Sequence, residues 1–128
     1  MNPEQTPQDE LHLDRKDRFI SHALVEVRKY RWWPFGVHSA VLLDISLQGF
    51  KCEFTAPFDT NIGASYWLTI PLPPLGIFAP SKISCLGECR WFDANTMRFG
   101  GVFVELDKTQ RLLIEQVVST LSANDKRL

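Results

Sequence analysis

The 128-residue sequence predicts an all-β fold with a single C-terminal helix. Between residues 23 and 104, short segments alternate apolar and polar side chains with a period of two, which is typical of strands, and turn-forming residues separate these segments. After residue 107 the apolar residues recur at spacings of three and four, which is typical of a helix. Six short strands in close succession favour an antiparallel sheet closed into a barrel, with the helix covering one open end or edge.

The first half of the chain contains three of the predicted strands. Residues 23–28 place alanine or valine at every second position, and residues 50–55 repeat this pattern with phenylalanine and cysteine. Between them, a proline and a glycine in the segment 32–36 mark a turn, and residues 41–46 form the second strand. We expect one face of that second strand to comprise Val41, Leu43 and Ile45, with Ile45 toward the core.

The second half contains the other three strands. Strand patterning appears in residues 66–70, 83–92 and 97–104, and Asp93-Ala94-Asn95 predicts a hairpin turn between the last two. The prolines and the glycine between residues 71 and 76 predict a loop, for which a polyproline segment is the weaker alternative.

The helix has a recognisable start. Asp107 is followed three residues later by Gln110, which resembles a capping box and places the first turn directly after Asp107. The apolar residues with helical spacing are Leu113, Ile114, Val117, Val118 and Leu121. The predicted organisation is therefore a disordered tail (1–13), a basic arm (14–22), a barrel with its helix (23–122) and a short tail (123–128).

Charge and composition exclude several classes of protein. The chain carries 14 basic and 15 acidic residues, so it is not basic throughout, and we expect no nucleic acid polymer as a partner. No apolar run reaches the ~18 residues that a membrane helix needs, and the N-terminus lacks the features of a secretory signal. Three cysteines cannot form a disulfide framework. We therefore expect a cytoplasmic protein without membrane insertion.

The basic residues are unevenly distributed. Six of the 14 lie between Arg15 and Arg31, against two acidic residues in the same span, which leaves a net charge of about +4 there. This segment is expected to attract an anion.

The hexapeptide Asp44-Ile45-Ser46-Leu47-Gln48-Gly49 carries the most chemical information. In a strand, Asp44 and Ser46 project from the same face, away from the core, and Gly49 follows where the chain must turn, with a positive φ as one possibility. A carboxylate accepts hydrogen bonds from a paired N–H and NH₂, which is what the Watson–Crick edge of guanine offers, and the hydroxyl can contact a phosphate or a further donor. The alternative is a strand end with a local turn, because turns favour Asp, Ser and Gly.

This hexapeptide resembles the D/N-x-S-x-x-G motif of the PilZ family, bacterial receptors for the second messenger cyclic di-GMP. The resemblance extends over residues 14–121, because the basic arm, the hexapeptide, a late strand pair and a terminal helix follow one another in the order that the family shows. It implies a six-stranded antiparallel PilZ-type β-barrel, a ligand-binding site for cyclic di-GMP and no catalytic function. The site residues that it implies are Arg15, Arg18, His22, Asp44, Ser46 and Gly49.

The arm departs from the family pattern of two arginines separated by three residues. Arg15 is followed four residues later by Phe19, and Arg18 by His22. Either Arg15 and Arg18 act as a pair with closer spacing, or Arg18 is the first member and His22 replaces the second, which the position of His22 directly before the first strand favours. Arginine suits this role because its planar fork binds phosphate or the guanine O6/N7 edge in two places.

Other residues suggest no second chemistry. Cys85 and Cys89 are expected to pack in the core, since no histidine or further cysteine pair accompanies them, and we expect no metal and no cofactor. Trp32 and Trp33 are expected to pack, with an exposed contact patch as the alternative. The sequence thus predicts a receptor that acts on an unidentified effector protein as a monomer or dimer. The alternative function is a PilZ-fold adaptor that has lost nucleotide binding and acts through protein contacts, for example in type IV pili or motility.

Overall fold

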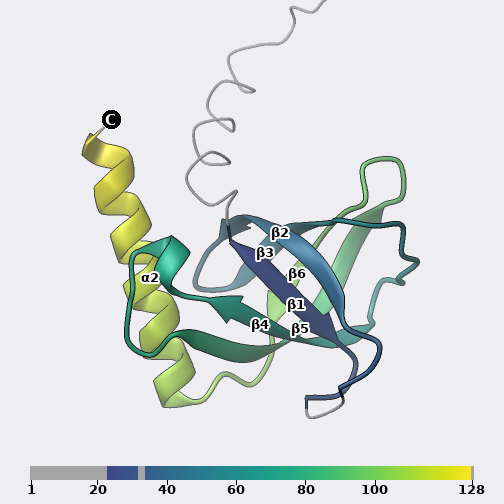
Figure 1. Cartoon of the computed structure of the whole chain (residues 1–128), viewed down its shortest axis with the longest axis horizontal. Helices are drawn as coiled ribbons and strands as arrows, with labels where there is room; N and C mark the ends of the chain where they lie inside the picture. Colours follow the sequence, from purple (N-terminus) through teal and green to yellow (C-terminus); the bar gives the residue numbers. More distant parts are fainter. Residues whose placement is uncertain (1–22, 32–33, 128) are drawn as a thin grey trace, which may run out of the picture.

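The computed structural model describes residues 23–31 and 34–127 (Figure 1). This part of the chain forms six strands, a short 3-10 helix and a long C-terminal helix. The strands are β1 (Leu24–Arg28), β2 (His38–Ile45), β3 (Gly49–Phe54), β4 (Ser65–Pro71), β5 (Lys82–Asp93) and β6 (Arg98–Phe103). The helices are η1 (Pro73–Leu75) and α2 (Lys108–Arg127). The predicted tail (1–13), the basic arm (14–22) and the Trp32-Trp33 pair lie outside the described residues.

The six strands form a closed barrel in the order β1-β2-β3-β6-β5-β4, and every neighbouring pair is antiparallel. The barrel closes between the first and fourth strands, where Val27 lies opposite Leu68. Closure leaves no unpaired sheet edge. The predicted fold class, an antiparallel six-stranded barrel with one C-terminal helix, is confirmed.

The first strand has the alternation that the sequence predicts. Ala23, Val25 and Val27 are buried inside the barrel, whereas Leu24 and Glu26 face outward. The β5–β6 hairpin also turns at the predicted place, and the amide of Asn95 donates a hydrogen bond to the Asp93 carboxylate at 2.9 Å within that turn. The alternation of apolar and polar residues therefore determines the first strand, and the turn-forming residues determine the hairpin, both through local sequence.

The second strand departs from the predicted face pattern. Its register with β3 passes from Leu42 opposite Cys52 to Asp44 opposite Lys51, so Leu43 is an extra residue in a β-bulge. Leu42 therefore belongs to the barrel core together with Ile45, and the expected shared face of Val41, Leu43 and Ile45 is wrong. The alternation could not reveal this, because Val41, Leu42 and Leu43 are all apolar.

Aromatic rings fill the barrel near β3 and β6. The rings of Phe54 and Phe99 stack with centroids 4.3 Å apart and planes 13° apart. The ring of Phe50 meets that of Phe99 edge-on, with centroids 5.9 Å apart. It lies tilted against the ring of Phe103, with centroids 5.4 Å apart. Strand β3 continues from the hexapeptide, and strand β6 leads to the C-terminal helix. Because the packed rings come from these two strands, they provide a rigid base beneath both the hexapeptide and the start of the helix.

The C-terminal helix begins as predicted. The Asp107 carboxylate accepts a hydrogen bond from the Gln110 amide at 2.7 Å, and the Gln110 side chain accepts one from the Asp107 amide at 2.8 Å, which completes a capping box. Ile114 and Val117 then bury their side chains against the barrel. The helix continues to Arg127, past the expected end at residue 122, because its last residues include no proline or glycine to stop it.

The proline-rich connection is more ordered than the expected loop. Pro73 begins the 3-10 helix η1, and Leu72, Leu75 and Ile77 are buried in the core. Gly76 follows with a φ of 92° and lies against Thr120 of the C-terminal helix. This connection therefore packs the helix onto the barrel, as Figure 1 shows.

The three cysteines are free and buried inside the barrel, as the sequence predicts for Cys85 and Cys89. The pKa of the Cys85 thiol is raised to about 12, mainly by burial and additionally by Asp107, while Arg31 lowers it. Burial also raises the pKa of Cys52 and of Cys89. Because the thiolate is the reactive and metal-binding form, these thiols act as apolar packing groups.

Candidate functional site

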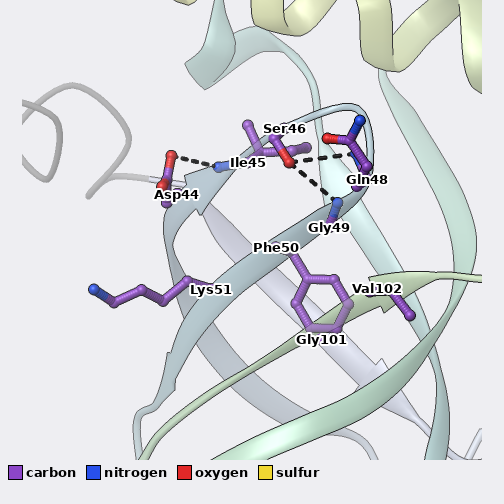
Figure 2. Close-up of a pocket in the computed structure, with 9 residues that line it drawn as sticks. All are labelled: Asp44, Ile45, Ser46, Gln48, Gly49, Phe50, Lys51, Gly101 and Val102. Carbon is purple, nitrogen blue, oxygen red and sulfur yellow. Dashed lines mark hydrogen bonds between the residues drawn. The ribbon is translucent and has the colours of Figure 1, made fainter.

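A cleft of about 280 Å³ opens beside the β2–β3 hairpin (Figure 2). Residues 44–46 and 48–51 line one side of it, and Gly101 and Val102 of β6 line the other. We call it the hairpin cleft. It contains every described residue of the predicted site, because Asp44, Ser46 and Gly49 all belong to its lining.

Asp44 lies at the end of the second strand, half-buried and directly opposite Lys51. One of its carboxylate oxygens, Oδ1, accepts a hydrogen bond from the amide of Ile45 at 2.9 Å. Within the described residues, no donor contacts the other oxygen, and no ion pair joins the carboxylate to Lys51. The bond to Ile45 fixes the orientation of the carboxylate at the mouth of the cleft and leaves acceptor positions for a ligand.

Ser46 closes the hairpin turn. Its hydroxyl oxygen accepts hydrogen bonds from the amides of Gln48 at 3.3 Å and Gly49 at 3.2 Å, and its own amide donates to the Gly49 carbonyl at 2.8 Å. The local-turn interpretation of the hexapeptide therefore holds for this residue. The hydroxyl hydrogen meets no acceptor in the described part of the chain, so it can still donate to a ligand oxygen.

A glycine is required at position 49 because of a close backbone contact, and not because the turn needs a left-handed conformation there. Its φ is not positive, whereas Gly36, Gly63 and Gly76 do have a positive φ. A Cβ atom at Gly49 would overlap the carbonyl oxygen of Gly101 in the neighbouring strand. The glycine thus permits close approach of two backbones at the floor of the cleft, and the positive φ that the sequence left as a possibility does not occur.

Two further side chains of the cleft were not predicted from the sequence. Lys51 and Gln48 both line it, and Figure 2 shows Lys51 on the same side of the hairpin as Asp44, with Gln48 nearer the tip. The signal for Lys51 was present: Phe50 and Cys52 point inward, so the residue between them must point outward beside Asp44. Consecutive glycines at 100 and 101 also indicated a close backbone approach.

Together these groups have the chemistry to bind a ligand that carries both hydrogen-bond donors and negative charge. Asp44, Ser46 and Lys51, which carry a carboxylate, a hydroxyl and an ammonium group, all line this one cleft. Arg15, Arg18 and His22 lie outside the described residues, so the structure does not place them. Among the described residues, no group of three or more His, Cys, Asp or Glu side chains is arranged to hold a metal ion. Across the same residues, no helix combines the length and the apolar character needed to cross a membrane.

The sequence model of the PilZ domain family matches residues 15–119. This chain therefore belongs to the PilZ domain family. No curated protein sequence matches it.

Two solved structures show the same fold. The structure of the Bacillus subtilis inhibitor of motility MotI/DgrA superposes with a TM-score of 0.62 at 16% identity, covering 81% of this chain. This chain spans about half, 48%, of the length of that protein. The PilZ domain of CeSA from a cellulose-synthesising bacterium superposes with a TM-score of 0.57 at 14% identity, covering 80% of this chain and 96% of the domain. At these identities the likeness concerns the fold.

Proposed function

We propose that this protein is a cyclic di-GMP receptor that transmits the level of this second messenger to a partner protein. Membership of the PilZ family supports the class of ligand. The observation that carries the proposal is that Asp44, Ser46 and Lys51 all line the hairpin cleft.

Each of these side chains has a role that suits the ligand. Asp44 accepts from the N1–H and the amino group of a guanine, while Ser46 donates to a ligand oxygen. Lys51 neutralises a phosphate. Gly49 contributes no side-chain contact and permits the backbone approach that shapes the cleft floor. The cleft is at the small end of the range for ligand pockets, so it accommodates part of a dinucleotide, and the arm supplies further contacts.

The arm supplies the cations in one of two ways. Arg15 and Arg18 act as a pair, or Arg18 acts with His22. An imidazole carries charge only when it is protonated, so the second arrangement predicts tighter binding at pH 6 than at pH 8. Replacing His22 with Arg then strengthens binding at pH 8, whereas the first arrangement makes this substitution neutral.

The protein acts as a receptor without catalysis, metal or cofactor in this proposal, and its location is the cytoplasm. Its three thiols are buried with raised pKa values, so none is an activated nucleophile. MotI is described as an inhibitor of motility, and the CeSA domain comes from a cellulose-synthesising bacterium. Motility and exopolysaccharide output are accordingly the processes that we propose for this receptor.

A second candidate function is an adaptor that binds a partner protein without nucleotide. The altered arginine spacing of the arm supports it, and so does the β1–β2 connection, where Tyr30 is 59% exposed and Phe35 is 70% exposed. Exposed aromatic side chains are common at protein–protein contacts.

Isothermal titration calorimetry of the whole chain with cyclic di-GMP separates the two functions, with GTP and cyclic di-AMP as competing ligands. The receptor proposal predicts selective, saturable binding that weakens about ten- to a hundredfold in an Asp44→Asn variant. Asp93→Asn, in the hairpin at the opposite end of the barrel, serves as the matched control and should bind as the parent does. If the parent releases no heat with cyclic di-GMP, nucleotide binding is refuted and the adaptor function takes its place.

A further inference from the structure

A second cleft of about 400 Å³ adjoins the hairpin cleft. The two clefts share Gln48 and Val102 in their linings, so they adjoin at these two residues. We call the second one the junction cleft, because Glu105 and Leu106 of its lining belong to the connection between β6 and α2. The proposed function uses Asp44, Ser46 and Lys51, none of which lines the junction cleft. That function therefore assigns no role to the junction cleft.

The junction cleft combines an apolar floor with one acid and one base. Leu47, Phe103 and Leu106 provide the apolar part, and Glu105 and Arg111 provide the charges. Leu47 is 43% exposed at the tip of the hairpin, where an apolar side chain gains from a covering ligand. A flat, apolar ring with polar edges fits this arrangement.

The two charged side chains line the same cleft but do not pair with each other. Among the described residues, neither Glu105 nor Arg111 takes part in an ion pair, and neither side chain makes a hydrogen bond. Some other charges on the barrel surface are paired, as Arg98 and Glu53 are at 3.0 Å. The acid and the base of the junction cleft are therefore available to a ligand that carries both donors and acceptors.

The backbone at Glu105 supports a role for its side chain. Glu105 has a φ of 53°, in the left-handed region that glycine adopts at lower cost. The conformation itself would favour glycine or asparagine here, and yet this position supplies the only carboxylate among the described residues that line the junction cleft. Strained backbone of this kind concentrates at functional positions.

We infer that the junction cleft binds the second guanine of cyclic di-GMP, an inference that rests on the proposed function. Glu105 accepts from the N1–H and the amino group of this guanine, as Asp44 does for the first. Arg111 donates from its planar fork to O6 and N7 or to the adjoining phosphate. The apolar floor covers one face of the ring. One ligand molecule thus spans Gln48 and Val102, with one base in each cleft.

The test compares cyclic di-GMP with the mixed cyclic guanosine–adenosine dinucleotide by calorimetry on the whole chain. Two guanine sites predict that the parent prefers cyclic di-GMP about tenfold or more, since adenine offers the wrong edge to either carboxylate. Glu105→Gln should weaken cyclic di-GMP about tenfold and bring the ratio of the two affinities close to one. Arg111→Gln should weaken both dinucleotides. The matched controls are Glu115→Gln and Arg90→Gln, both exposed and outside the clefts, and they should behave as the parent does.

The outcomes separate this inference from the proposed function. If Asp44→Asn weakens cyclic di-GMP while Glu105→Gln and Arg111→Gln retain the parent's affinity and preference, the receptor function stands and the junction-cleft inference is overturned. If the parent does not bind cyclic di-GMP at all, the proposed function fails and this inference fails with it. Far-UV circular dichroism of each variant confirms that the barrel is intact.

Discussion

The backbone of Gly49 lies directly against the carbonyl oxygen of Gly101, so no side chain fits between β3 and β6 at this point. Gly101 in turn lies against the carbonyl oxygen of Glu88 in β5, where a Cβ atom would also overlap. Three neighbouring strands are thereby brought close together at the end of the barrel that carries the hairpin cleft. The site is shaped by the absence of side chains as much as by the polar groups on its rim.

Gly49→Ala should therefore destabilise the fold strongly. The methyl group meets a backbone oxygen that cannot rotate away, so we expect a loss of about 3 kcal/mol in the free energy of unfolding, measured by urea denaturation. Gly36→Ala is the control, because nothing lies within 4 Å of its Cβ position and only its left-handed φ of 68° opposes the change. That variant should lose about 1 kcal/mol. Equal losses in the two variants would contradict the overlap at Gly101.

Ser46→Ala removes the acceptor for two amides of the hairpin turn. We expect a loss of about 1 kcal/mol in stability together with weaker binding of cyclic di-GMP, since turn and ligand use the same hydroxyl group. Ser46→Thr keeps the hydroxyl and should retain most of both properties. Full stability in the alanine variant would show that the hydroxyl does not hold the turn.

Lys51→Gln should weaken cyclic di-GMP about fivefold, the effect of one partly exposed charge on a phosphate. The salt dependence of the affinity should also become shallower, because one fewer charge contributes. Lys82→Gln, which removes an exposed lysine outside both clefts, controls for net charge. Titrations at two ionic strengths measure both effects, and an unchanged salt dependence would exclude Lys51 from phosphate binding.

Alkaline pH should reveal the buried thiols. The pKa of Cys85 rises from its ordinary value of 9.0 to about 12 in the folded protein, mainly through burial. Above pH 9 the unfolded chain releases a proton that the folded protein retains, so the stability due to this group falls between pH 9 and pH 12. At pH 10 the loss is about 1.4 kcal/mol relative to pH 7.

Urea denaturation of the parent and of Cys85→Ala at pH 7 and pH 10 measures this contribution. The stability difference between the two proteins should shrink by about 1.4 kcal/mol at the higher pH. A difference that stays constant with pH would mean that Cys85 ionises equally in the folded and unfolded chain.

Local signals were sufficient for most of the fold. The alternation in β1 and the capping box of Asp107 and Gln110 depend on neighbours within a few residues, and both appear in the structure as predicted. The bulge at Leu43 depends on how two strands align, and a run of three apolar residues gives no sign of it. The closure of β1 on β4 likewise joins segments about 40 residues apart, which only the closed sheet brings together.

In the candidate site, too, the residues set by local sequence were predicted, and those brought together by the fold were not. The hexapeptide identified Asp44, Ser46 and Gly49, because a strand followed by a turn places them at one edge. The junction cleft was not foreseen, since Leu47 and Arg111 are 64 positions apart and meet only because β6 leads into the helix at that point. Gly49 was predicted as a turn residue, but the structure requires a glycine there because the backbone of a neighbouring strand leaves no room for a side chain.

The most direct test of the central claim is amide chemical-shift mapping by NMR on the isotope-labelled whole chain as cyclic di-GMP is added. The account predicts saturable shifts of the amides of residues 44–51 and of Gly101 and Val102, with little change in the hairpin at residues 93–97. Shifts that centre on that hairpin, or no shifts at saturating nucleotide, would contradict binding at the hairpin cleft.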